Sequence, residues 1–153
     1  TPMELNWERA ESTPSYRYSW INAQMKALED TRWSIAIPKS SGVAFRNNNP
    51  GNLKYAGQRK AEKGSEGFAR FNTTADGFRA LVGQIILDGT RGFTLKEFVN
   101  KYAPAAGSDY GQTIADRLGK PLESLVKSLN PLLVAQVVMF AESGSQFERR
   151  SEI

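Results

Sequence analysis

The most constraining feature of this sequence is a long apolar segment near its C-terminus. Residues 130–144 read NPLLVAQVVMFAESG and are apolar nearly all round. Asn130 suits the N-cap of a helix and Pro131 its first position, because proline has no backbone N–H to lose there. A helix without a polar face has to be covered by other elements. The segment therefore predicts a central, buried helix.

Other helices are predicted on both sides of a region rich in glycine, proline and asparagine. Residues 74–89 place apolar side chains at i, i+3, i+4, i+7 and i+8, with Thr74 as the expected N-cap and Gly89 as the stop. Thr94 and Glu97 have the spacing of a capping box. Helices are expected over residues 16–30, 74–89, 94–103, 108–119, 121–129 and 130–144.

The region between the first two helices has the composition of turns and short strands. From Ile35 to Phe71 it predicts a small hairpin around LKYAG and GFARF. Residues 1–14 contain two prolines and no clear period, and are expected to form an N-terminal arm. These patterns predict a mainly helical α+β fold. The length of 153 residues favours a single domain, expected over residues 15–153.

The composition excludes several kinds of catalytic chemistry. The chain has no cysteine and no histidine, so thiolate nucleophiles, Ser-His-Asp machinery and histidine-ligated zinc are ruled out. An enzyme with this composition must use carboxylates for acid-base chemistry, with tyrosine or lysine as further candidates. No metal or cofactor is expected.

Two glutamates are candidates for a general acid. Glu29 is four residues after Met25, so it should share the apolar face of the first helix, where desolvation would raise the pKa of its carboxyl group. Glu142 is at the end of the most apolar helix, and its E-S-G context is similar to that of a lytic transglycosylase. For each, the alternative is an ordinary charged helix end. The sequence leaves both open as the acid.

A second carboxylate is predicted in the hairpin region. Glu62 and Glu66 flank the short KGS segment beside GFARF, and either is a candidate for a base or an ion stabiliser across a sugar site. Ordinary surface glutamates are equally compatible with this position.

The turn RNNNPGN concentrates neutral amides in one place. Asparagine, proline and glycine favour turns for backbone reasons alone. Neutral amides also suit the hydroxyl and acetamido groups of sugars, with aromatic rings as stacking platforms. Candidate sugar-binding residues are therefore Asn47, Asn48, Asn49, Asn52, Tyr55 and Tyr110.

These motifs resemble a known family. RNNNPGNLKYAGQ, GFARFNTTADGFRAL, TLKEFVNKYAP and YGQTIADRLG look like phage-associated lysozyme-like domains that have an R-N-N-N-P-G-N signature. The resemblance runs from about residue 23 to 119. It implies a lysozyme-like helical bundle with a small β-hairpin lobe, and members occur in virion proteins, prophage regions and secreted wall-active proteins.

A wider likeness is to flagellar-type glucosaminidases, in which a helix with A-Q and A-L-E motifs leads into an asparagine-rich turn. This likeness assigns the catalytic acid to Glu29, the lobe glutamate to Glu66 and the helix tyrosine to Tyr110. Those relatives often have E-S-G or E-G at the acid, whereas Asp30 follows Glu29 here. Glu142 comes after the asparagine turn in the chain, and it would form a permuted acid site if it met that turn in space.

The resemblance implies cleavage of a β-1,4 glycosidic bond in peptidoglycan, as a muramidase, lytic transglycosylase or glucosaminidase. The alternative is a non-catalytic virion or wall-binding module. A net charge of +4 favours approach to an anionic wall, and a nucleic-acid-binding domain would rest on that charge alone. Glycan strands are the expected partner, with other virion or secretion-system proteins. Nucleic acid and a membrane span are not expected. The opening residues are too acidic for a signal peptide, so delivery to the periplasmic wall by a virion or a secretion route is expected.

Overall fold

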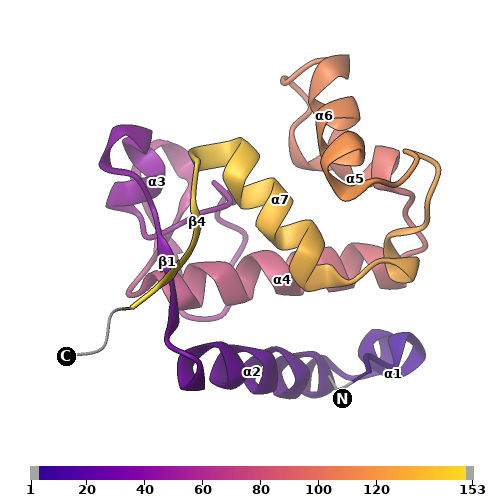
Figure 1. Ribbon diagram of the computed structural model, residues 1–153, viewed down its shortest axis with the longest axis horizontal. Coiled ribbons are helices and arrows are strands. Elements are labelled where there is room, and N and C mark those ends of the chain that lie inside the picture. The colour runs from indigo at the N-terminus through magenta and orange to yellow at the C-terminus, as the bar shows by residue number, and fades with distance from the viewer. Residues whose placement is uncertain (1–3, 151–153) are drawn as a thin grey trace.

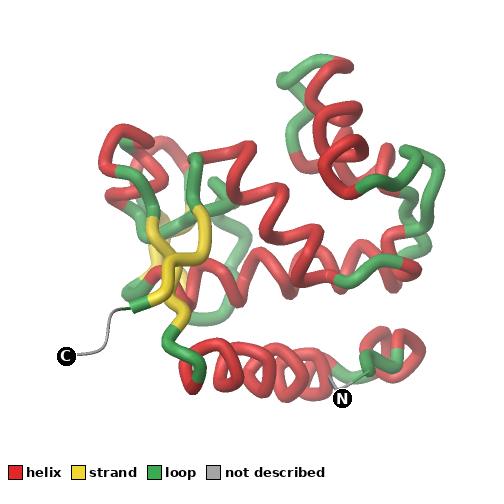
Figure 2. Tube along the Cα trace, viewed as in Figure 1, coloured by secondary structure: helices red, strands yellow, loops and turns green. Residues whose placement is uncertain are grey.

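A computed structural model describes residues 4–150, with Ser108 described by its backbone alone. The fold is α+β and mainly helical, with two antiparallel two-stranded sheets in the described part (Figure 1). Figure 2 shows the strands gathered at one end of the helices. The helices are α1 (Trp7–Ser12), α2 (Pro14–Asp30), α3 (Val43–Arg46), α4 (Thr74–Thr90), α5 (Leu95–Tyr102), α6 (Ser108–Leu118) and α7 (Pro131–Ser143). The strands are β1 (Trp33–Ala36), β2 (Ala61–Lys63), β3 (Ala69–Phe71) and β4 (Gln146–Arg149).

Helix α4 is at the centre of the fold. It packs against α1, α2, α7, β1 and β3, and it runs between α2 and α7 in Figure 1. Its buried apolar residues are Phe78, Leu81, Val82, Ile85 and Ile86. This is the apolar stripe predicted from the sequence, and it forms the middle of the hydrophobic core.

Helix α7 is less buried than its composition predicts. Val134, Ala135 and Val138 are fully buried, but Leu133 is 53% exposed and Phe140 is 41% exposed. The reason is that α4, α6 and β4 cover α7 on some sides only. The predicted burial of α7 is therefore only partial, and α4 has the central position instead.

Helix ends follow their local signals closely. Asn130 caps α7 by accepting from the backbone N–H of Leu132, and Thr94 and Glu97 form the predicted capping box of α5. The N-cap of α4 is Thr73 instead of Thr74, because its side chain reaches the backbone N–H of Asp76. The helix predicted over residues 121–129 is reduced to a 3₁₀ turn, η3 (Val126–Ser128).

The segment predicted as an N-terminal arm contains α1. Asn6 caps this helix, and Ala10 is fully buried because α1 packs against α4 and α2. A Cβ atom at Gly89 of α4 would lie 2.4 Å from the ring of Trp7, so α1 and α4 approach closely because Gly89 has no side chain. Residues 1–3 lie outside the described part.

Two sheets join distant parts of the chain. β1 and β4 pair antiparallel from Trp33 opposite Arg149 to Ala36 opposite Gln146, and they lie side by side in Figure 1. This pairing brings the C-terminal end of α7 beside the segment that follows α2. The β1 to β4 pairing has no local signal in the sequence, because both strands are only four residues long.

The predicted hairpin is present in altered form. Its second strand is β3, but the partner of β3 is β2, with Ala61 opposite Phe71. The expected first strand contributes only a single bridge between Lys54 and Phe68. Left-handed backbone at Gly57 and Lys60 bends the chain between Lys54 and β2. We call residues 53–71 the lobe. No described helix is long and apolar enough to cross a membrane.

Candidate active site

The asparagine turn, residues 47–52, has two residues in left-handed backbone. Asn48 has φ 51° and Asn52 has φ 50°, a conformation that asparagine tolerates better than other side chains with a Cβ. The Asn48 amide donates to the backbone carbonyls of Phe71 at 2.9 Å and Asn72 at 3.2 Å. The turn is therefore joined to the end of β3.

Asn49 connects the turn to the lobe. Its side chain is fully buried and donates to the carbonyls of Leu53 and Ala69, both at 2.9 Å, and accepts from the Leu53 N–H at 3.0 Å. Asn47 is also fully buried, and neither of its amide atoms has a partner in the described chain. Left-handed backbone and hydrogen bonds to backbone groups thus explain why asparagine is present at positions 48 and 49, without a ligand.

Replacement of Asn49 by alanine should destabilise the protein. The change leaves the Leu53 N–H and two carbonyls without their partner, so we expect the free energy of unfolding to fall by about 2–4 kcal/mol. Urea denaturation followed by circular dichroism measures this. Asn72→Ala removes an exposed asparagine side chain of the same size, and its effect should stay within about 0.5 kcal/mol. Equal midpoints for the two variants would contradict the structural role of Asn49.

The turn contacts the C-terminal end of α7. The Ser143 hydroxyl donates to the carbonyl of Pro50 at 2.6 Å, and the Asn52 amide donates to the carbonyl of Glu142 at 3.4 Å. Gly51 follows Pro50 in the turn, and its carbonyl accepts a hydrogen bond from the hydroxyl of Tyr102 in α5. Helices α5 and α7 therefore meet the asparagine turn at one place.

Gly51 allows this close approach. A Cβ atom there would lie 2.6 Å from the Tyr102 hydroxyl and 3.0 Å from the side chain of Leu81. The Pro-Gly pair of the motif thus has a packing reason in addition to its turn-forming one.

Glu142 is at this junction. Its side chain is partly buried, and its Oε2 accepts a hydrogen bond of 2.5 Å from the hydroxyl of Tyr110 in α6. Burial raises the pKa of the Glu142 carboxyl group, and the bond from Tyr110 lowers it by a smaller amount. A carboxyl group with a raised pKa keeps its proton to higher pH, as a general acid must.

The two tyrosines around Glu142 remain protonated donors. Burial raises the pKa of Tyr110, and the bond to Glu142 adds to this effect. Burial also raises the pKa of Tyr102, with a smaller contribution from the charge of Glu142. The site therefore consists of one carboxyl group, two phenol donors and the amide of Asn52.

Tyr110→Phe should raise the pKa of Glu142 further. The hydroxyl of Tyr110 stabilises the carboxylate form, so its removal leaves burial unopposed. Titration of the Glu142 side-chain carbon by ¹³C NMR measures the shift. Tyr55→Phe removes a hydroxyl from an exposed ring and is the control. A Glu142 pKa that is unchanged or lower in Tyr110→Phe would contradict the described bond.

Glu29 lies elsewhere. Its side chain is 56% exposed, and its carboxylate is 3.8 Å from the guanidinium of Arg79. The prediction that Glu29 shares the buried face of its helix is therefore wrong. Met25 is buried, but Glu29 is one turn later, in the last turn of α2, where the side chain is no longer covered. Glu29 does line a small cavity of about 240 Å³ with Leu28 and Trp33. The described lining of that cavity includes none of the predicted asparagines or tyrosines.

The lobe glutamates are exposed. Glu62 is in β2 and is 3.7 Å from Arg70, and Glu66 has left-handed backbone with φ 59°. Tyr55 is 41% exposed on the lobe. None of these three side chains has a described hydrogen bond to Glu142 or to the asparagine turn.

Of the candidates from the sequence, the structure brings Asn52, Tyr110 and Glu142 together. Ser143 and Tyr102 join them without having been predicted as contacts of the turn. Ser143 belongs to the E-S-G segment, which is the one sequence signal that could have indicated it. No protein-family model matches the chain, and no significant similarity to a curated protein is found.

Proposed function

We propose that this protein cleaves β-1,4 glycosidic bonds in peptidoglycan glycan strands, with Glu142 as the general acid. The observation that supports this most strongly is the contact between the asparagine turn and a partly buried glutamate with a raised pKa. In this proposal Glu142 protonates the leaving oxygen of the bond as the sugar develops oxocarbenium character.

The arrangement is that of a permuted lysozyme-like site. In the families that the sequence resembles, the acid precedes the asparagine turn, whereas Glu142 comes 90 residues after Asn52. Pairing of β1 with β4 and the bond from Ser143 to Pro50 join the two segments. Glu142 is followed by Ser143 and Gly144, which is the E-S-G context expected of the acid, whereas Glu29 is followed by Asp30.

Stabilisation of the oxocarbenium-like centre is assigned to the substrate. Burial and Tyr110 account for the direction of the Glu142 pKa, with no contribution from another described carboxylate. Glu62 and Glu66 are exposed on the lobe. We therefore propose that the acetamido or 6-hydroxyl group of the sugar fills this role instead of a second carboxylate. Tyr110 orients the Glu142 carboxyl group, and Asn52 holds the backbone of Glu142 at the turn. The protein acts at the bacterial wall after delivery by a virion or a secretion route.

Release of dye from labelled, purified sacculi tests the proposal. We expect the wild-type protein to release soluble dye at a rate proportional to its concentration, with no added metal. Binding to sacculi without any release would favour a non-catalytic wall-binding module. Failure to release dye from sacculi of several bacterial wall types would overturn the proposed activity.

A further inference from the structure

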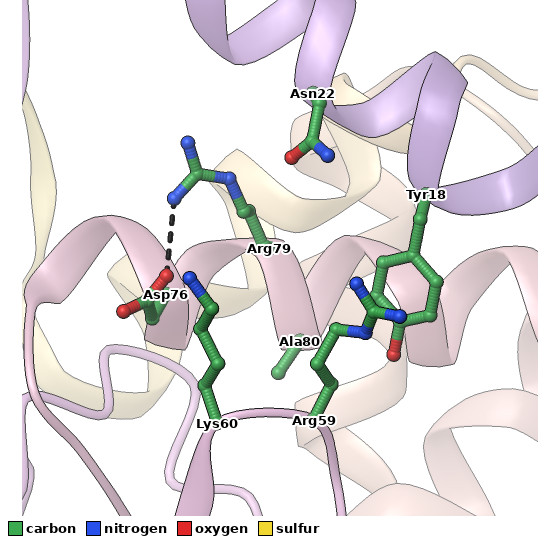
Figure 3. Close-up of a pocket in the computed structure, with 7 residues that line it drawn as sticks. All are labelled: Tyr18, Asn22, Arg59, Lys60, Asp76, Arg79 and Ala80. Atoms are coloured by element: carbon green, nitrogen blue, oxygen red, sulfur yellow. Dashed lines mark hydrogen bonds and ion pairs between the residues drawn. The ribbon is translucent and has the colours of Figure 1, made fainter. Parts of the chain in front are cut away.

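A second feature of the molecule is a groove between the lobe and helices α2, α4 and α5. Two adjoining cavities of about 310 and 500 Å³ form it, and both are lined by Tyr18 and Ala80. Cavities of this size accommodate ligands of several hundred daltons. We call it the basic groove. Figure 3 shows its smaller end, where Arg59, Lys60 and Arg79 surround one space.

The basic groove is strongly positive. Among the residues that the structure describes, seven lysine or arginine residues and two aspartates line it, which gives it a net charge of +5. The whole chain has 20 Lys and Arg against 16 Asp and Glu, which is a net charge of +4. The residues outside the groove lining therefore have a net charge of −1. Because clefts focus the field of their charges, the groove should attract anions specifically.

Internal contacts hold some of these cations in place. At the larger end, the carboxylate of buried Asp88 is 2.7 Å from Lys101 and 3.1 Å from Arg91. At the smaller end, Arg79 is 3.1 Å from Asp76 and 3.8 Å from the carboxylate of Glu29. These carboxylates orient the cations but neutralise only part of the charge of the groove.

Arg59 and Lys60 have no such partner. Neither forms an ion pair with a described residue, and the Arg59 guanidinium is 4.3 Å from the ring centre of Tyr18. Lys60 has left-handed backbone with φ 60°, and both side chains extend into the space drawn in Figure 3. They are therefore available to bind an external anion.

Much of the apolar lining of the groove is small or aliphatic. Ala56, Ala80 and Gly83 line it together with Ile21, Leu53 and Leu87. This combination of small apolar contacts and cations fits a short peptide with carboxylates and small side chains. It suits nucleic acid less well, because base recognition needs free aromatic faces and Arg59 covers one face of Tyr18.

The groove also adjoins the candidate active site. Leu53 lines it and follows Asn52 in the chain, and Tyr102 lines it while donating to Gly51 of the asparagine turn. A ligand in the groove would therefore lie beside a glycan strand that is bound at the asparagine turn.

We propose that the basic groove binds the acidic peptide attached to the glycan strand. The carboxylates of this peptide pair with Arg59 and Lys60, and its small side chains contact the apolar lining residues of the groove. The proposal rests on the proposed function, since it takes the glycan strand as the substrate. It adds that the protein distinguishes strands with peptides from bare strands.

Calorimetric binding to two soluble wall fragments tests this. The probes are a disaccharide with its tetrapeptide and the same disaccharide without it, with Glu142→Gln as the uncleaving background in 50 mM salt. We expect the peptide-bearing fragment to bind about tenfold more tightly, which is about 1.4 kcal/mol. Adding Arg59→Gln and Lys60→Gln should reduce this preference to less than threefold.

The control removes the same charge elsewhere. Lys96→Gln with Lys120→Gln changes two exposed lysines outside the groove and should keep the preference. Equal affinity for the two fragments, or equal loss in both double variants, would overturn the proposal. Tighter binding of a thymidine oligomer of equal charge would also overturn it, in favour of nucleic acid. Since the variant does not need to cleave, a failed dye release leaves this test intact. Cleavage without a peptide preference would overturn the groove assignment alone.

Discussion

Glu142→Gln should lower the rate of dye release from sacculi by about 100- to 10,000-fold, the range for loss of a general acid. The amide keeps the shape of the side chain, and its oxygen still accepts from Tyr110, but it has no proton of suitable acidity to donate. Glu29→Gln is the matched control, because it makes the same chemical change at an exposed site. We expect it to retain at least about half of the wild-type rate, as substitutions at exposed positions usually do.

Thermal unfolding of both variants accompanies this comparison. Because burial disfavours the charged form of Glu142, Glu142→Gln should be at least as stable as the wild type at pH 7, so its loss of activity would not come from unfolding. The stability difference should shrink as pH falls below the Glu142 pKa, where the native carboxyl group is itself neutral. A large loss of activity in Glu29→Gln, with Glu142→Gln active, would exchange the roles of the two residues.

Gly77→Ala should destabilise the protein strongly. A Cβ atom at Gly77 would lie 2.1 Å from the carbonyl oxygen of Asn48 and 2.9 Å from Cδ of Pro50. Because backbone at Asn48 cannot rotate away as a side chain can, either the turn or α4 must shift. We expect the free energy of unfolding to fall by about 2–4 kcal/mol. Dye release should fall as well, since the turn supports the end of α7.

Gly83→Ala makes the same substitution six residues later in α4. Its Cβ atom would meet only the Ile21 side chain, at 3.8 Å, which is an ordinary contact. Alanine has the higher helix propensity, so we expect a gain of about 0.5–1 kcal/mol. Urea unfolding measures both variants, and opposite signs are the expected result. A neutral Gly77→Ala would contradict the close approach of α4 to the asparagine turn.

Local signals in the sequence were sufficient to predict most helices. The capping box at Thr94 and Glu97 and the Asn-Pro start of α7 depend on neighbours within one turn, and the structure confirms both. The apolar stripe of α4 needs only its own spacing. Composition predicts more burial for α7 than the structure has, because it does not indicate which neighbours cover a helix, and Leu133 and Phe140 are exposed.

The site depends on contacts that local patterns do not encode. The spacing of Glu29 from Met25 predicts a buried face, but Glu29 is in the last turn of α2 and its side chain is 56% exposed. Glu142 reaches the asparagine turn through the pairing of β1 with β4, two four-residue strands more than a hundred residues apart. The sequence kept Glu142 as an alternative acid, and tertiary structure supplies the physical argument for it.

The asparagine run has two explanations, as its sequence suggested. Asn48 and Asn49 hold the lobe by bonds to backbone groups, which is a structural role. Asn52 donates to the backbone carbonyl of Glu142, while its own amide oxygen is buried and has no hydrogen-bond partner among the described residues. The motif therefore identifies the place where the lobe and α7 meet, and the proposed chemistry is assigned to Glu142 beside it.

Mass spectrometry of the fragments released from purified sacculi is the most direct test of the proposed glycan cleavage. Wild-type protein should yield muropeptides with new sugar ends, either reducing or 1,6-anhydro, and Glu29→Gln should yield the same set. Glu142→Gln should yield none above background. Peptides released from intact glycan strands, or an unchanged set of sugar ends with Glu142→Gln, would contradict glycosidic cleavage by Glu142.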